Sequence, residues 1–310
     1  MTVSRVLRGK GYTSKAVTEK VLNAAEEIGY VRNKLAGSFA GQSTNLIGVI
    51  IPSLSNSVFT DVLTGFDDAI RDSGLQPAIG VSHYDQAREY QLVRDMLAWR
   101  PASIVLTGME HDDRTRKLLT QNDVRTIEII DVDGDPISKC VGLSHRVAAE
   151  EMASHLISRG HTRFGYVGSA LQADLRALKR RTAFEAALMA KGFEVERIVT
   201  SPKPSSMLLG RQLTAEILQK NTSPIALYYS NDDLASGGLL ECLARGVSIP
   251  DKVAIASFNG LDFLDAMPLQ ITTLKSPRYE IGQIAGRYML GGVIADTTRL
   301  TGKLIIGDTT

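Results

Sequence analysis

Several polar side chains in this sequence fall directly after apolar, β-branched runs, where they could bind a small polar ligand. Asp131, Asn231 and Asp232 carry the carboxylate and amide groups that pair with neighbouring hydroxyls of a sugar. Arg180, with Arg176 as an extra cation, can hold a carboxylate or a phosphate in its planar fork of N–H donors. These residue types together favour a ligand with hydroxyls and an acid group.

The same residues also have structural interpretations. An Asn-Asp pair before a helix is a good N-cap, so Asn231 and Asp232 can divide capping and ligand contact between them. The basic run that contains Arg176, Lys179 and Arg180 can in part form a solvated helix face. Binding is favoured over catalysis, because G-x-S-x-G, P-loop and G-x-G-x-x-G motifs are missing from the sequence.

Cys140 and Cys242 are far apart, with no second thiol or histidine at metal-ligand spacing, so we expect reduced structural cysteines and neither a metal nor a cofactor. The chain begins without an apolar signal region and contains no run of 18 apolar residues. With 44% apolar and 22% charged residues, it has the composition of a folded globular protein. We therefore expect a cytoplasmic protein outside the membrane.

After about residue 45, predicted strands alternate with predicted helices, as in βα units, and these elements must position the polar groups. Buried strands are predicted at 46–51, 77–82, 103–107, 126–130, 164–168, 225–230 and 253–258. Helices are predicted at 58–73, 86–98, 112–120, 146–159, 179–191, 209–220, 233–245 and 278–293. These units are too many for one small sheet. The expected fold class is α/β, with two doubly wound parallel-sheet lobes and a ligand site at the strand ends that face the cleft.

The first 45 residues differ in both pattern and charge. They hold seven Lys or Arg against three acidic residues, which leaves 28 basic and 31 acidic residues in the rest of the chain. Helices are predicted at 2–7 and 14–28, with Ser14 as the N-cap of the second. A short helix at 33–41 is weakened by Gly37. A basic segment of net charge +4 on a body of net charge −3 favours a polyanionic partner.

Motifs along the whole chain carry a family resemblance. They are TVSRVL (2–7), S-x-x-x-x-E-K-V (14–21), IGYVRNKLA (28–36), LIGVIIPSLSNSVF (46–59), GHTRFGYVG (160–168), RRTAF (180–184), SNDDLASG (230–237), IPDKVAIASFNG (249–260) and TTLKSP (272–277). Joined in this order, they resemble the LacI/GalR family of bacterial transcription regulators. The resemblance implies a partial all-α helix-turn-helix at 1–32, a hinge helix at 33–44 and a periplasmic-binding-protein-like body at 45–310. The first lobe would take about 45–144 plus 276–310, and the second about 145–275.

The resemblance also implies which residues meet operator DNA. On the helix-turn-helix these are Thr2, Ser4, Arg5 and Ser14, and on the hinge helix they are Asn33, Ala36, Phe39 and Ala40. An arginine at position 5 can fork onto guanine, the small hydroxyls can reach phosphates, and Phe39 can act as an apolar wedge in the minor groove. The alternatives are solvated surface charge for Arg5 and packing on the body for Phe39.

One departure from the family concerns the helix that normally precedes the recognition helix, because this sequence begins just before TVSRVL. Without that helix, the other two can bury little apolar surface. Either the sequence is truncated or the protein has lost operator binding. We favour truncation because TVSRVL, Tyr30 and Asn33 remain.

Within the family the sequence most resembles the gluconate repressors, through PSLSNSVF (52–59), the pair His83-Tyr84, the LT…H-x-x-R-T pattern (106–115), Asp131 and FNGLD (258–262). Arg180 takes the place of the family's effector-binding arginine. The implied effector-binding residues are Ser53, Asn56, Phe59, His83, Asp131, Arg176, Arg180, Asn231, Asp232, Asn259 and Asp262. Two of these have simpler alternatives, since Phe59 can pack one wall and His83 can be an ordinary loop residue.

The sequence therefore predicts a repressor whose affinity for operator DNA is controlled by a small sugar acid such as gluconate. The residues themselves do not distinguish release of DNA from recruitment, and the resemblance to the gluconate repressors implies release. A homodimer is expected through helices 58–73 and 86–98, with a tetramer as the alternative. The competing hypothesis is a sugar or sugar-acid binding protein without DNA binding, either a sensor or a transport-type binder. An enzyme explains the pattern least well.

Overall fold

The computed structural model describes residues 2–8, 12–30, 44–220 and 223–310. The chain divides into two compact units, Met1–Thr44 and Asn45–Thr310. The predicted helix at 33–41, with Asn33, Ala36, Phe39 and Ala40, lies outside the described residues. Within the described part, no helix has the length and apolar character needed to cross a bilayer.

The first unit contains α1 (Thr2–Arg8) and α2 (Lys15–Glu27), close to the predicted bounds. Ser14 occupies the N-cap of α2, but its side chain makes no capping hydrogen bond. Val6 on α1 is buried, whereas no residue of α2 is. These helices therefore bury little apolar surface, as the sequence predicts.

The first lobe of the second unit is built on a sheet with the strand order β11-β5-β4-β3-β1-β2, in which neighbouring strands are parallel. Its strands are β1 (Leu46–Ile51), β2 (Gln76–Val81), β3 (Ser103–Thr107), β4 (Arg125–Asp131), β5 (Lys139–Leu143) and β11 (Thr297–Arg299). Central strands such as LIGVII are apolar along their length, because helices cover both faces of the sheet.

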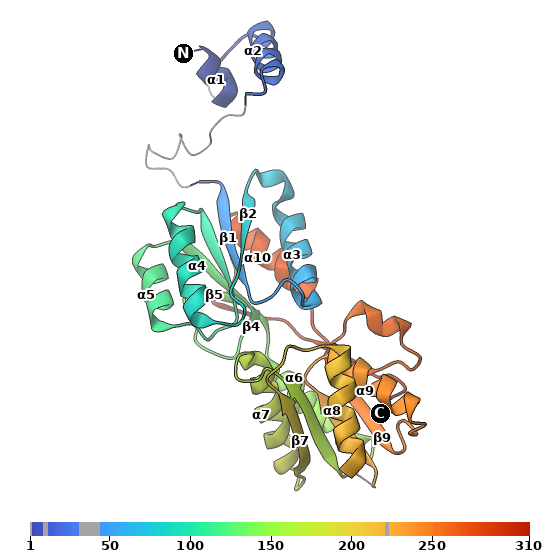
Figure 1. The fold of residues 1–310 in the computed structure, drawn as a ribbon. Coiled ribbons are helices and arrows are strands. Elements are labelled where there is room, and N and C mark those ends of the chain that lie inside the picture. Colours follow the sequence, from blue (N-terminus) through green and yellow to red (C-terminus); the bar gives the residue numbers. More distant parts are fainter. Residues whose placement is uncertain (1, 9–11, 31–43, 221–222) are drawn as a thin grey trace. The chain divides into compact units, whose positions relative to one another are not determined.

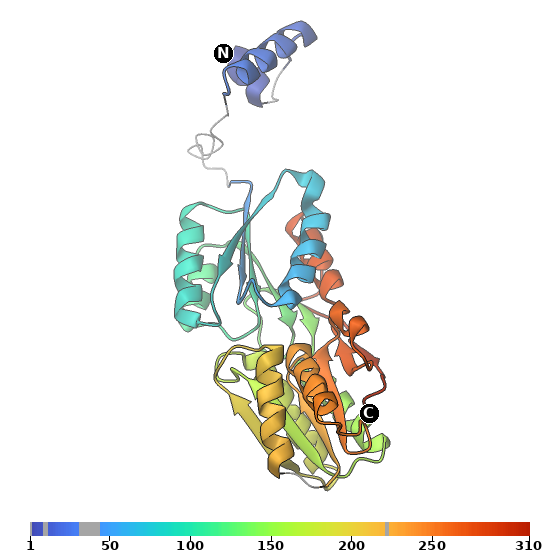
Figure 2. The same ribbon diagram turned by 45° about the vertical axis from the view of Figure 1, so that its right-hand side comes forward.

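One face of this sheet is covered by α3 (Ser57–Ile70) and α10 (Arg278–Met289), which lie side by side in Figure 1 and Figure 2. The other face is covered by α4 (Gln86–Ala98) and α5 (Asp113–Gln121). Successive side chains of β1 point to opposite faces of the sheet. Val49 packs in the core beside α3, and Ile50 packs in the core beside α4. The α/β class with two parallel-sheet lobes is confirmed by this lobe and the next.

The second lobe repeats the plan with the strand order β12-β10-β9-β8-β6-β7, in which only the β10–β12 pair is antiparallel. Its strands are β6 (Phe164–Ser169), β7 (Val195–Ser201), β8 (Ile225–Tyr229), β9 (Val253–Asn259), β10 (Thr272–Lys275) and β12 (Lys303–Ile305). Its helices are α6 (His145–Ser158), α7 (Leu175–Met189), α8 (Met207–Lys220) and α9 (Asp232–Ala244). Helices α6 and α7 pack on one face of the sheet and α8 and α9 on the other.

Helices α3 and α10 touch backbone to backbone where they cross. A Cβ on Gly65 would overlap the carbonyl group of Tyr279, and a Cβ on Gly282 would overlap that of Val62. The crossing of α8 and α9 uses the same arrangement at Gly237. Glycine permits these approaches because it has no Cβ.

Within the described residues, the chain passes between the lobes three times: between β5 and α6, between β10 and α10, and between β11 and β12. The third passage corrects the prediction that all of 276–310 belongs to the first lobe. β11 pairs with β5, but β12 pairs with β10 of the second lobe. Thr309 then donates to Ile255 O and accepts from Thr272 N, which fixes the last residues there.

Candidate ligand-binding site

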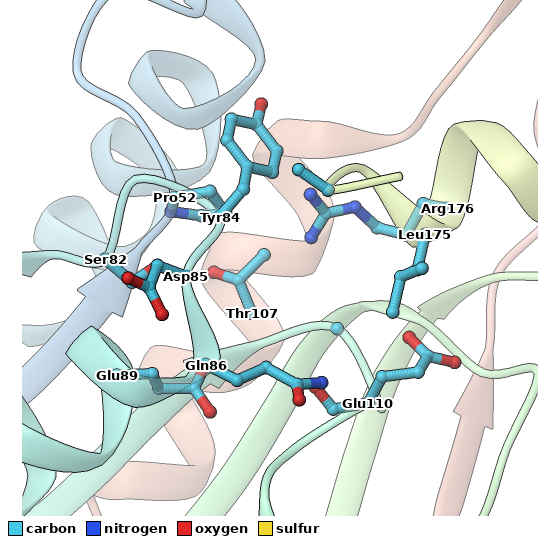
Figure 3. A pocket seen from close by; sticks show the side chains of 12 residues that line it. Pro52, Ser82, Tyr84, Asp85, Gln86, Glu89, Thr107, Glu110, Leu175 and Arg176 are labelled. Atoms are coloured by element: carbon cyan, nitrogen blue, oxygen red, sulfur yellow. The ribbon is translucent and has the colours of Figure 1, made fainter. Parts of the chain in front are cut away.

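A pocket lies between the two lobes, at the carboxyl ends of β1, β2 and β3 (Figure 3). Its first-lobe wall includes Tyr84, Glu89, Thr107 and Glu110, and its second-lobe wall includes Arg176. The pocket has a cavity volume of about 50 Å³ and lies in a hollow of about 410 Å³ that is partly open to solvent. Carboxyl ends of parallel strands are where α/β folds bind ligands, so this pocket is the candidate site.

Arg176 reaches this pocket because α7 begins at Leu175, rather than at the predicted residue 179, with Asp174 as its N-cap. Its guanidinium lies 5.7 Å from the ring centre of Tyr84 and 6.0 Å from that of Phe59. The side chain is buried, yet none of the described residues accepts a hydrogen bond from it, and its ion pair with Asp174 spans 3.4 Å. Burial alone would lower the pKa of Arg176, but the charge of Asp174 raises it. Arg176 is therefore a cation with donors to offer a ligand.

Arg180 is held more firmly than Arg176. Its Nη1 donates to His145 Nδ1 at 2.9 Å, its Nη2 donates to Ser230 O at 2.9 Å, and the guanidinium lies over Phe258. Burial, followed by the charge of Arg180, holds the pKa of His145 well below its usual range, so the ring is neutral and Nδ1 can accept. In the described part of the chain, Arg180 Nε and His145 Nε2 are buried without a partner. Arg180 thus keeps one unused donor.

Asp131 forms part of an ion bridge across the lobes. Lys179 Nζ, on α7 of the second lobe, donates to Asp131 Oδ2 at 2.6 Å and to Asp133 O at 2.9 Å, and it lies 2.5 Å from Glu110 Oε1. Burial alone would lower the pKa of Lys179, but Asp131 and Glu110 raise it, so the lysine stays charged. The Asp131 carboxylate, predicted to bind ligand hydroxyls, is therefore committed to Lys179, and the pair holds the lobes together.

Replacing Lys179 by methionine is expected to loosen the contact between the lobes, because it leaves Asp131 buried without its cation. Amide hydrogen exchange in the loops after β3 and β4 should increase by about tenfold or more, which corresponds to roughly 1.4 kcal/mol. Lys191→Met, at an exposed residue just beyond the same helix, is the matched control and should change nothing. Equal exchange in the two variants would show that the bridge does not hold the lobes.

Asn231 and Asp232 are both engaged inside the second lobe. Asn231 Oδ1 caps α9 by accepting from Leu234 N at 3.1 Å. Asp232 is fully buried and accepts from Leu261 N at 2.7 Å, from Thr273 Oγ1 at 2.9 Å and from Ser257 Oγ. Burial raises the pKa of Asp232 to about 6 despite these donors. The structure thus accounts for Asp232 as an internal support, without a ligand.

Of the first-lobe candidates, Asn56 and Phe59 lie beside the pocket. Asn56 Oδ1 caps α3, and its amide donates to the Tyr84 hydroxyl at 3.4 Å, while Phe59 is buried under Arg176. Ser53 bonds within its own loop, to Ser55 Oγ. The prediction that His83 faces the ligand is not supported by its position. Both His83 and Tyr84 have positive φ, and this turn leaves His83 exposed while Tyr84 lines the pocket.

The remaining second-lobe candidates lie at the junction with α10. Asn259 has a φ of 121°, and its carbonyl oxygen accepts from Ser276 N and from the buried Arg278. Asp262 does not line the pocket between the lobes: its side chain is 83% exposed and pairs at 3.5 Å with Lys275. The structure therefore does not bring Asp262 together with the other predicted ligand contacts.

Sequence reasoning does not single out three residues that line the pocket, Tyr84, Glu89 and Glu110. It also treats Lys179, which bridges the lobes, only as part of a basic run. The three lining residues could have been identified as pocket residues from their positions, because they lie at the carboxyl ends of predicted strands or one turn into the next helix. Among the residues that the structure describes, no group of His, Cys, Asp and Glu side chains is arranged to hold a metal.

Thr2, Ser4 and Arg5 are exposed on α1, and Ser14 is exposed at the start of α2. Their side chains are accessible within this unit, as contact with a nucleic acid requires.

Residues 1–33 match the family described as bacterial regulatory proteins, lacI family, and residues 153–310 match the periplasmic binding protein-like domain. The HTH-type transcriptional regulator GntR of Pseudomonas aeruginosa is 34% identical over 300 residues, which cover 96% of this chain and 87% of that protein. The regulator of the same name from Escherichia coli is 30% identical over 293 residues, with coverage of 94% and 88%. The crystal structure of a LacI-family transcriptional regulator from Silicibacter pomeroyi is 39% identical, covers 100% of this chain and 95% of that one, and superposes with a TM-score of 0.96.

Proposed function

Because this chain belongs to the LacI family of bacterial regulatory proteins and is a DNA-binding transcriptional regulator, we propose that it responds to a small sugar acid, such as gluconate, bound between its two lobes. The family was inferred from motifs spread over the sequence, and the comparisons confirm it. The proposed effector is supported by the resemblance to the gluconate repressors and by two relatives named GntR.

The observation that carries this proposal is the guanidinium of Arg176, which lies buried in the pocket without a hydrogen bond to any described residue. A planar guanidinium binds a carboxylate through two parallel hydrogen bonds. The opposite wall offers oxygen atoms of Thr107, Glu89 and Glu110, which suit hydroxyl groups. A polyhydroxy acid would satisfy both walls at once.

We propose that the ligand changes the relative orientation of the lobes and that this change lowers the affinity for operator DNA. The Lys179 bridge crosses the same cleft, so a ligand between Arg176 and the first lobe would alter the contacts that hold the lobes together. The acting form would be a homodimer with contacts on α3 and α4. On the first unit, Arg5 would read a base edge while Thr2, Ser4 and Ser14 reach phosphates.

Replacing Arg176 by glutamine is expected to weaken gluconate binding by about 10- to 100-fold, because a hydrogen bond to a charged group contributes roughly 1.5–3 kcal/mol. Isothermal titration calorimetry of the full chain measures this change. Arg181→Gln is the matched control, since Arg181 lies on the same helix and pairs with Glu185 instead of facing the pocket. Arg180→Ala should also weaken binding if its unused Nε–H meets the ligand.

Unchanged affinity in Arg176→Gln would contradict the assignment of the acid group to Arg176. A wild-type chain that binds neither gluconate nor another polyhydroxy acid would overturn the effector class itself.

A further inference from the structure

The wall of the pocket opposite Arg176 is supported by a buried histidine. The side chain of His111, in the loop after β3, is fully buried. Its Nδ1 lies 2.7 Å from Glu89 Oε1, and its Nε2 lies 3.2 Å from Gly108 O and 3.4 Å from Glu128 Oε1. Each of these neighbours offers an oxygen as a hydrogen-bond acceptor, an arrangement that favours a proton on both ring nitrogens. The contacts of His111 therefore favour its imidazolium form.

The surroundings of His111 also favour its charged form. Burial alone would lower the pKa of His111, but the carboxylates of Glu128 and Glu89, which lie beside its two ring nitrogens, raise it to about 9. Glu128 is fully buried and accepts from Ile137 N through Oε2, so it is fixed in place. The histidine thus stays charged at neutral pH.

Glu89 has one oxygen to spare. It lies in the first turn of α4, is 7% exposed and lines the pocket beside Gln86 and Thr107 (Figure 3). Its Oε1 is taken by His111, whereas none of the described residues donates a hydrogen bond to Oε2. A carboxyl group that is buried at the pocket wall and held through its other oxygen is a preorganised acceptor for a hydroxyl group.

We propose that Glu89 is a specificity-determining residue that accepts a hydrogen bond from a ligand hydroxyl, and that His111 is the residue that positions it. This inference rests on the proposed function, since it assigns the hydroxyl end of the same ligand whose acid group meets Arg176. The two walls then select jointly: the guanidinium of the second lobe rejects neutral polyols, and the fixed carboxylate of the first lobe rejects acids that lack hydroxyls.

The test compares gluconate with its single-deoxy analogues, each of which lacks one hydroxyl, in the wild type and in Glu89→Gln. The wild type should bind one analogue at least about tenfold more weakly than gluconate, because a charge-assisted hydrogen bond is lost. In Glu89→Gln that discrimination should shrink to about twofold or less. Asp95→Asn, at an exposed residue of the same helix, should keep the wild-type pattern.

Discrimination that is fully retained in a folded Glu89→Gln variant would overturn this inference and leave the proposed function standing. A wild-type chain that binds none of these acids would overturn both. If Glu89→Gln does not fold, ¹⁵N NMR of the histidine rings in the wild type decides: both nitrogens of His111 should be protonated at pH 7. A neutral ring would show that His111 is not the charged donor that positions Glu89, and would overturn the inference.

Discussion

Gly282→Ala is expected to destabilise the first lobe by about 3 kcal/mol or more, because overpacking a close-packed interface is costly. The added methyl group would overlap the carbonyl group of Val62 and lie 2.7 Å from Phe66 N, both of which are backbone atoms of α3. A flexible side chain could turn away from such a contact, but the backbone of a helix cannot. The two helices would have to separate and lose packing along their shared core. A large decrease in the midpoint of thermal unfolding should follow.

Glu280→Ala provides the matched control, since it changes an exposed residue of the same helix and adds no atom to the crossing. Its unfolding midpoint should stay within a few degrees of the wild type, as surface substitutions usually change stability by less than about 0.5 kcal/mol. If Gly282→Ala behaved like Glu280→Ala, the backbone contact between α3 and α10 would not be as close as the structure has it.

Asp232→Ala is expected to reduce the stability of the second lobe by on the order of 3 kcal/mol, because it leaves three buried donors without an acceptor. These donors are Ser257 Oγ, Leu261 N and Thr273 Oγ1, which belong to β9, the following loop and β10. One carboxylate thus joins three segments of the lobe. Thermal unfolding of the variant measures the loss, and Asp233→Ala, at the less buried next residue, is the control.

The contribution of Asp232 to folding stability is expected to depend on pH in a definite direction. Burial raises the pKa of Asp232 from 3.8 to about 6, so the unfolded chain ionises first as the pH rises. The stability that this group contributes is therefore greatest below about pH 4 and decreases as the pH rises through 6. This pH-dependent part of the folding stability should be missing from Asp232→Ala. A folded variant that keeps its stability but loses gluconate binding would instead make Asp232 a ligand contact.

The strands and helices of the body that have strong apolar patterns could be predicted from the sequence, because burial on both faces of a parallel sheet leaves a continuous apolar run. The sequence does not predict β5, β7, β10, β11 and β12. β7 lies at a sheet edge with exposed residues, β11 and β12 are three residues long, and the buried β5 and β10 have only five and four residues. Their positions depend on pairing with distant strands, which local sequence does not encode.

The pocket lies at loops that the sequence places at strand ends, but the sequence does not show which side chains are already engaged there. Sequence could place Asp131 at a strand end, yet not show that Lys179 from the other lobe would occupy it. Family position favours Arg180, although in the structure Arg180 is hydrogen-bonded within its own lobe, whereas the guanidinium of Arg176 donates no hydrogen bond to a described residue. Which of two arginines one helical turn apart is already hydrogen-bonded depends on tertiary contacts that the local sequence does not show.

The short link between β11 and β12 governs how the cleft can move. Four steps from Arg299 to Lys303 span at most roughly 14 Å, and each end is hydrogen-bonded into a different sheet. The other two passages leave from β5 and β10, which neighbour β11 and β12 in the sheet orders. The lobes are thus pinned along one edge, while β2, next to the pocket, lies five strand spacings away, about 24 Å. With that lever arm, a rotation of about 10° would shift the pocket wall by about 4 Å, enough to admit or expel a ligand while the pivot hardly moves.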